Sequence, residues 1–210
     1  MSIPATCPRC GAALRAPGLM DSAWQCERHG AVAPLKVLPR VTADALRQVS
    51  RSATVPVWSP LPLLAGWTVT GLGVAGPDGA PSAVATTLSG PSPLGGPADL
   101  VVVAEEPGIG LGARVAGLDT VDPGLGRPGA PDAKLDAAGH DTPLWRSDSA
   151  DDRCAFVGEA GGVWLWAVLW PPAAELVLLE HVVLHDLRHD AHVAEELAFG
   201  APTHRLALPA

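Results

Sequence analysis

The sequence predicts an α+β protein, in which a small N-terminal module precedes a mainly antiparallel, Gly/Pro-rich sheet domain with few short helices. Three observations support this prediction. Two cysteine-containing knuckles lie within the first thirty residues. Glycine and proline contribute 23 and 22 of the 210 residues, which favours many turns and short strands. Hydrophobic residues make up 48% of the chain, enough for a substantial core, and only 17% are charged.

The N-terminal module carries the strongest chemical signal. Its knuckles read C-P-R-C-G at 7–11 and C-E-R-H-G at 26–30, with fifteen residues between Cys10 and Cys26. Ligands two residues apart can face one tetrahedral ion, and the following glycine allows a tight turn. The spacing predicts a zinc ribbon with one structural zinc ion on Cys7, Cys10, Cys26 and His29. Four protein ligands leave no open position for catalysis, so the ion is expected to stabilise the fold of this short segment.

A disulfide is the less favoured interpretation of the cysteines. The first six residues lack the basic region and apolar stretch of a secretory signal, which predicts a cytoplasmic protein with reduced thiols. Residues 1–30 resemble the zinc ribbons at the N-termini of many bacterial proteins. The sequence therefore predicts three segments: a zinc-ribbon-like module (1–30), a linker with a short helix (31–51), and an α+β domain of unknown function (52–210).

Charge is unevenly distributed along the chain. Residues 1–55 contain seven basic and three acidic residues, whereas the remainder contains seven basic and nineteen acidic residues. An acidic body disfavours nucleic acid and anionic membranes as partners, and the basic first part is expected to lie against this body rather than on a polyanion. A membrane span is also disfavoured, because proline and glycine interrupt the nearly uncharged run of residues 52–98 every few positions.

The chain after the knuckles alternates extended segments with turns. Pro34 and Pro39 keep residues 31–41 extended, and Thr42 is the expected N-cap of a helix over 43–51. Residues 67–75 and 82–88 are typical of strands joined by a Pro-Asp-Gly turn, and 89–97 are expected to form a loop. Residues 99–104 are apolar enough to form a central strand.

A glycine-rich turn follows this central strand. The segment from Gly108 to Ala113 matches G-x-G-x-x-A, a phosphate-binding pattern, but Glu105 and Glu106 would repel phosphate. No second strand ending in an acidic residue follows, as a dinucleotide site requires. A turn into a short helix over 112–118 is therefore favoured, followed by a Pro/Gly/Asp-rich loop over 119–143 and a charged turn over 147–153.

The C-terminal third contains the tryptophan-rich strand. Residues 154–159 and 163–170 predict a hairpin around Gly161-Gly162, with Trp164, Trp166 and Trp170 on one face. The uncharged second strand should lie inside the sheet, between 154–159 and a strand over 176–184, with Trp166 in the core. A short helix is expected within residues 190–198.

Four histidines, His181, His185, His189 and His192, leave an alternative open. On a helix they would share a face and could chelate a metal, but on a strand they would be too far apart. The strand interpretation favours a titrating surface patch. Cys154 beside Arg153 is interpreted as a buried structural cysteine, and His140-Asp141 as a plain turn.

Behind the zinc knuckle, residues 54–60, 89–97 and 164–171 resemble a group of uncharacterised actinobacterial proteins. The resemblance spans most of the chain and implies a cytoplasmic bacterial protein, without implying an activity. The favoured function is a non-enzymatic interaction or regulatory protein, whose partner is another protein or a second copy of the chain. The alternatives are an enzyme with a site near the turn between Gly108 and Gly112 and the 119–143 loop, and a weak nucleic-acid contact through the basic N-terminal module.

Overall fold

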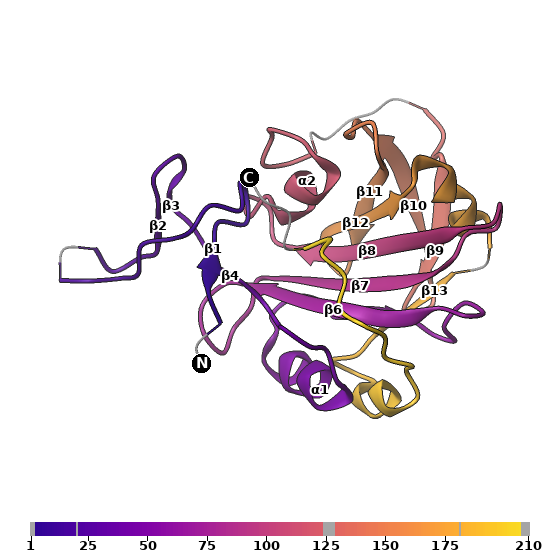
Figure 1. The fold of residues 1–210 in the computed structure, drawn as a ribbon, viewed down its shortest axis with the longest axis horizontal. Coiled ribbons are helices and arrows are strands. Elements are labelled where there is room, and N and C mark those ends of the chain that lie inside the picture. The colour runs from indigo at the N-terminus through magenta and orange to yellow at the C-terminus, as the bar shows by residue number, and fades with distance from the viewer. Residues whose placement is uncertain (1–2, 20, 124–128, 181, 207–210) are drawn as a thin grey trace.

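A large sheet forms the body of the molecule (Figure 1). The computed structural model describes residues 3–19, 21–123, 129–180 and 182–206. Within these residues the sheet has eleven strands in the order β1-β4-β6-β7-β8-β12-β11-β10-β9-β13-β5. Neighbouring strands are antiparallel except β13 and β9, which are parallel. The predicted architecture, mostly antiparallel sheet with few short helices, is confirmed.

The elements have the following bounds. The first half of the sheet contains β1 (Ala5–Thr6), β4 (Leu35–Val37), β6 (Thr68–Ala75), β7 (Ala83–Pro91) and β8 (Pro97–Glu105). The second half contains β12 (Val163–Trp170), β11 (Cys154–Ala160), β10 (His140–Ser147), β9 (Ala133–Ala137), β13 (Val183–Asp186) and β5 (Trp58–Pro60). A separate small hairpin consists of β2 (Gln25–Cys26) and β3 (Gly30–Ala31). The helices are α1 (Ala43–Ser52), α2 (Leu111–Ala116) and the 3-10 helices η1 (Pro172–Leu179) and η2 (Ala191–Glu195).

Both α-helices lie close to their predicted positions. The Thr42 hydroxyl accepts a hydrogen bond from the backbone N–H of Ala45, as expected of an N-cap, and α1 begins at Ala43. Helix α2 begins and ends at left-handed glycines, Gly110 and Gly117. Figure 1 shows α1 and α2 on opposite sides of the sheet.

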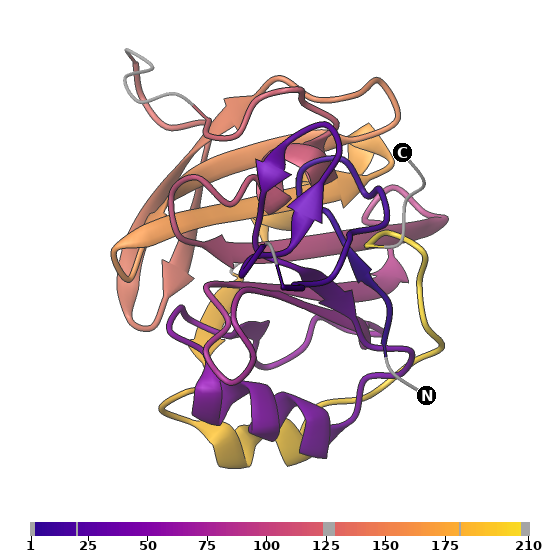
Figure 2. The ribbon, with the colours of Figure 1, turned by 90° about the vertical axis from the view of Figure 1, so that its left-hand side faces the viewer.

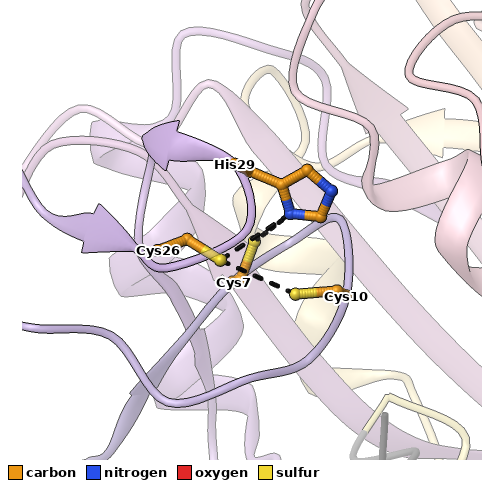
Figure 3. A group of neighbouring side chains, drawn as sticks. All are labelled: Cys7, Cys10, Cys26 and His29. Atoms are coloured by element: carbon orange, nitrogen blue, oxygen red, sulfur yellow. Dashed lines mark hydrogen bonds between the residues drawn. The ribbon is translucent and has the colours of Figure 1, made fainter.

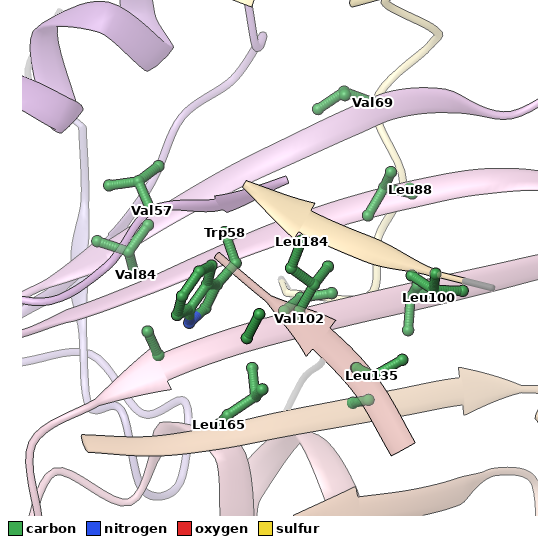
Figure 4. Close-up of a cluster of buried hydrophobic side chains, with 14 of the residues drawn as sticks. Val57, Trp58, Val69, Val84, Leu88, Leu100, Val102, Leu135, Leu165 and Leu184 are labelled. Carbon is green, nitrogen blue, oxygen red and sulfur yellow. The ribbon is translucent and has the colours of Figure 1, made fainter. Parts of the chain in front are cut away.

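The core lies on both faces of the central strands β8 and β12. Alternation along β12 places Leu165 and Leu169 on one face and Trp166 and Trp170 on the other. The tryptophan face packs against α2. The opposite face is covered because β5 packs back over β7 and β8, which brings Trp58 against Val84 and Val102 (Figure 4). The prediction that this strand is internal and Trp166 is core is confirmed, since Trp166 is 0% exposed.

Three local predictions are wrong. The 119–143 segment is not wholly loop, because its last part forms β9 and the start of β10; Lys134 and Asp136 on β9 alternate with the buried Leu135 and Ala137. Residues 176–184 are not one strand but the end of η1 followed by β13. Consequently β12 is flanked by β11 and β8 rather than by that segment. Residues 124–128 lie outside the described part of the chain.

The N-terminal knuckles are attached to one edge of the sheet. Strand β1 pairs with β4, and β4 pairs with β6, so residues from the predicted module and from the predicted linker extend the sheet of the larger domain. Figure 2 shows the β2–β3 hairpin in front of this edge, beside α2. Whether the three predicted segments fold independently stays a prediction. None of the helices described is long and apolar enough to span a membrane.

Candidate metal centre and adjoining cavity

Two tight turns position the four predicted ligands. Cys7 directly follows β1, and its carbonyl accepts a 2.8 Å hydrogen bond from the backbone N–H of Gly11. Cys26 ends β2, and His29 immediately precedes β3. Gly11 and Gly30 have φ angles of 76° and 68°, a left-handed conformation that other residues adopt only with strain. The glycine after each knuckle therefore allows the tight turn that directs two ligands toward one point.

The four ligand atoms meet at one point (Figure 3). They all lie within 4.8 Å of one another. The Cys10 and Cys26 sulfurs are 3.7 Å apart, and His29 Nδ1 is 3.5 Å from the Cys7 sulfur and 3.7 Å from the Cys26 sulfur. A tetrahedral zinc ion with Zn–S near 2.3 Å and Zn–N near 2.0–2.1 Å requires S···S of about 3.8 Å and S···N of about 3.5 Å. The donor set and its spacing therefore fit zinc.

The same distances exclude a disulfide in this structure. A disulfide needs its sulfurs about 2.05 Å apart, whereas the sulfurs of Cys10 and Cys26 are 3.7 Å apart. Cys7, Cys10, Cys26 and Cys154 are all free. Cys154, on β11, is fully buried away from the cluster, and burial raises the pKa of its thiol. It is a structural core residue, as predicted.

The cluster contains one thiol that ionises readily and one that resists ionisation. Burial tends to raise the pKa of Cys26, but hydrogen bonds from the backbone N–H groups of Arg28 and His29 outweigh it and lower the pKa to about 6. Burial raises the pKa of the Cys7 thiol to about 11. A metal ion binds thiolates, so metal binding at this centre must displace a proton from Cys7.

A cavity of about 720 Å³ adjoins the metal centre. Its walls come from the knuckles, from α2 and the residues after it (117–121), and from the turn before β11. The charged and metal-binding side chains on these walls are Arg9, Cys10, Arg28, His29, Arg114, Arg153 and Asp119. This cavity cannot be predicted from local sequence patterns, because its walls come from segments more than a hundred residues apart in the chain.

Three of the arginines are held in place by carbonyl oxygens. Arg9 donates from Nη2 to Gly108 O at 2.6 Å and from Nε to Ile109 O at 3.3 Å, which ties the first knuckle to the glycine-rich turn. Arg114 donates to Leu206 O, and Arg153 donates to Val115 O near the end of α2. The side chain of Arg28 is exposed and makes no hydrogen bond or ion pair with the residues that the structure describes.

The glycine-rich turn binds a carboxylate of the chain itself. Glu105, only 1% exposed, accepts hydrogen bonds from the backbone N–H groups of Leu111 at 2.7 Å and Gly112 at 3.0 Å. These are the first amides of α2, where a phosphate-binding turn would hold phosphate. Burial raises the pKa of Glu105 to about 7 despite these bonds. Glu105 therefore occupies two amides that a phosphate-binding turn would use, and the absence of phosphate binding at this turn stays a prediction.

The histidine cluster does not form a second metal centre among the described residues. His185 lies on strand β13, and its Nδ1 is 3.5 Å from an Asp190 carboxylate oxygen. His189 is exposed beside Asp186, and His192 lies on η2. His181, the fourth predicted member, lies outside the described residues. His140 is exposed, but it begins strand β10 and pairs with Ala137, so the prediction of a plain turn at His140-Asp141 is wrong.

Comparison with known proteins identifies a family whose function is unknown. A family model described as a family of unknown function (DUF6758) matches residues 1–206. No curated protein and no solved structure matches the chain.

Proposed function

Since the chain belongs to this family of unknown function, we propose a function from its own geometry: a non-enzymatic binding protein built around a structural zinc ion. Cys7, Cys10, Cys26 and His29 would hold the ion. The observation that carries the proposal is the convergence of these four ligand atoms within 4.8 Å. When bound, zinc would supply a fixed tetrahedral cross-link between the two knuckles.

The cross-link would orient the residues between the ligands. Arg9 lies within the first knuckle, and fixing Cys7 and Cys10 directs its guanidinium at the carbonyls of Gly108 and Ile109. Arg28 lies within the second knuckle, at the wall of the cavity. The zinc site thereby completes one wall of a cavity of ligand-binding size on the sheet domain.

This geometry moves the proposed binding role from the tryptophan face to the cavity. Trp166 and Trp170 are buried under α2 and cannot contact a partner directly. An enzyme remains the weaker alternative: residues 119–121 do line the cavity near the glycine-rich turn, but Cys10 and His29, the reactive groups on its wall, would both be bound to the metal.

Metal analysis of the reduced, purified protein tests the proposal. We expect one zinc ion per chain, loss of that ion in Cys26→Ser, and faster proteolysis of residues 1–30 in the same variant. Cys154→Ser is the matched control, because Cys154 is buried outside the cluster and its replacement should leave the zinc content unchanged. Reduced protein without zinc, or Cys26→Ser with its full zinc content, would contradict the proposal.

A further inference from the structure

The cavity beside the metal centre is basic, although the chain as a whole is acidic. Four guanidinium groups lie on its walls, from Arg9, Arg28, Arg114 and Arg153, against one carboxylate, Asp119. The chain has a net charge of −8. A concave site with clustered guanidinium groups concentrates positive potential and attracts anions.

Other negative groups near the cavity offset this charge only in part. Asp152 forms an ion pair with Arg153, and a zinc ion bound by three thiolates would carry one net negative charge near Arg114. Arg9 contacts two neutral carbonyls, and Arg28 contacts no carboxylate among the described residues. On the walls of the cavity itself, four guanidinium groups therefore face one carboxylate, Asp119.

His29 supplies a second indication of a missing acceptor. Its Nδ1 faces the sulfur atoms, and its other ring nitrogen, Nε2, points away from them (Figure 3). A metal-binding histidine usually donates its second N–H to a carboxylate, a carbonyl or water. Nε2 has no such partner among the described residues, and His29 lies on the cavity wall. An anion in the cavity would provide the acceptor.

We propose that this cavity binds a small organic anion that carries phosphate. Arg28, Arg9 and the Nε2–H of His29 are the groups that contact it. Guanidinium groups match phosphate oxygens in paired hydrogen bonds, and several of them around one cavity suit a group of more than one negative charge. Inorganic phosphate alone would fill little of about 720 Å³, and Leu118 and Val121 form an apolar wall for an organic part.

The proposal rests on the proposed function, because the zinc-bound knuckles form one wall of the site. It favours a small molecule over nucleic acid, since the site is concave and the surrounding body is acidic, which would repel a long polyanion. Asp119 allows an anion site to be distinguished from a purely structural arginine cluster. Its carboxylate would oppose binding of the anion, so removing that charge should strengthen binding only if the cavity binds an anion.

Calorimetry of the zinc-loaded full chain at low salt tests the site, with ADP as the probe and adenosine as the uncharged comparison. We expect ADP to bind, inorganic phosphate to compete, and adenosine not to bind. Arg28→Ala should weaken ADP binding by roughly tenfold, the loss of one charge-assisted hydrogen bond. Asp119→Asn should strengthen it severalfold. Arg51→Ala, an exposed arginine on α1 on the other side of the sheet, is the matched control and should change nothing.

Zinc content is measured on the same samples, so that failure of the anion site can be distinguished from failure of the proposed zinc centre. Zinc-loaded protein that binds no ADP, or binds it equally well as Arg28→Ala, overturns the anion site and leaves the metal centre standing. Equal binding of adenosine also overturns it. Binding of duplex DNA that weakens in Arg28→Ala, without binding of ADP, would overturn the small-molecule class and replace it with a polyanion. Protein without zinc overturns the proposed function instead.

Discussion

Trp166 shows how closely single residues are packed in this molecule. Its indole is 0% exposed and lies against Gly112 of α2, where an added Cβ would come within 2.4 Å of the ring. Such contacts between a strand and a helix leave no room for a larger residue at position 112. The tryptophan therefore fixes how closely α2 approaches the sheet, and α2 in turn carries Arg114 at the cavity.

Replacing Trp166 with alanine should reduce the free energy of unfolding by about 3–5 kcal/mol, because it leaves a large cavity between β12 and α2. Urea unfolding followed by circular dichroism measures this change. Trp145→Ala, at a half-buried position on β10, is the comparison and should cost less. A loss of under about 1 kcal/mol in Trp166→Ala would mean that the core can repack without the indole.

Glu105 is a buried carboxyl group whose raised pKa makes the stability of the protein depend on pH. Burial raises its folded-state pKa from 4.5 to about 7, and the nearby Asp122 charge adds to this shift. The folded protein thus binds the proton more tightly than the unfolded chain does. The stability that this proton contributes is fully present below pH 4.5 and is lost as pH rises toward 7, on the order of 3 kcal/mol in total.

Comparing the wild type with Glu105→Gln isolates this effect. The variant side chain stays neutral at every pH. The free energy of unfolding of the variant, relative to that of the wild type, should therefore be higher at about pH 8 than at about pH 5. The amide supplies one acceptor oxygen for the two N–H groups of Leu111 and Gly112, and this cost is the same at both pH values. Urea titrations of both proteins at both pH values measure the difference, and any titration of the metal ligands cancels from it. An unchanged difference would show that Glu105 does not titrate in this range.

At the scale of elements, strand β4 joins the N-terminal module to the larger domain. It pairs with β1 on one side and β6 on the other, and Leu35 is 0% exposed in the core beneath α2. The ten-residue helix α1 contacts η2, and the core cluster on that side of the sheet contains none of the described knuckle residues. The core on the α1 side of the sheet therefore forms without the knuckles, and β4 and the edge strand β1 extend the sheet beyond β6.

A chain that begins at residue 41 is accordingly expected to fold, but with lower stability. Losing the burial of Leu35, about 1.5–3 kcal/mol, should lower the thermal midpoint by roughly 5–10 °C. Circular dichroism with thermal unfolding measures both the fold and the midpoint. A disordered spectrum would show that residues 1–40 and the sheet share one core and that the predicted division at 31–51 is wrong.

At the scale of the whole molecule, charge is separated between a basic cavity and an acidic body. The net charge of −8 should repel a nucleic acid, which extends beyond the cavity over the acidic body. The positive charge of the cavity acts only over the short distance that a small ligand occupies. The molecule is therefore suited to a small anion better than to a polymer.

We expect the zinc-loaded protein to leave the mobility of duplex DNA unchanged in a gel-shift assay at about 0.1 M salt, where the screening length is about 10 Å. A DNA-binding protein run under the same conditions is the positive control. A shift that appears and then falls steeply with added salt would restore the nucleic-acid contact through the basic N-terminal module.

The sequence by itself determined the features that depend on near neighbours. The four ligands follow from two C-x-x-C/H-G knuckles, because ligand spacing and the glycine turn are local, and their convergence is now visible. The Thr42 cap, the strands β6 to β8 and the buried β12 also follow from short-range patterns of capping, alternation and charge. Residues 176–184 were ambiguous, because a mostly apolar run, interrupted only by Glu180 and His181, fits a helix and a buried strand equally well.

Only the tertiary structure decided which distant residues meet. Arg9 and Gly108 are 99 positions apart, and Arg9 and Arg153 share a cavity wall only because β1 and β4 bring the knuckles to the sheet edge beside α2. The same holds for Glu105. Its carboxylate reaches the first amides of α2 because strand β8 ends beneath that helix. Local sequence patterns do not predict such contacts, because they form only when segments far apart in the chain pack together. The cluster of Cys7, Cys10, Cys26 and His29 was thus predictable from the sequence, whereas the cavity beside it was not.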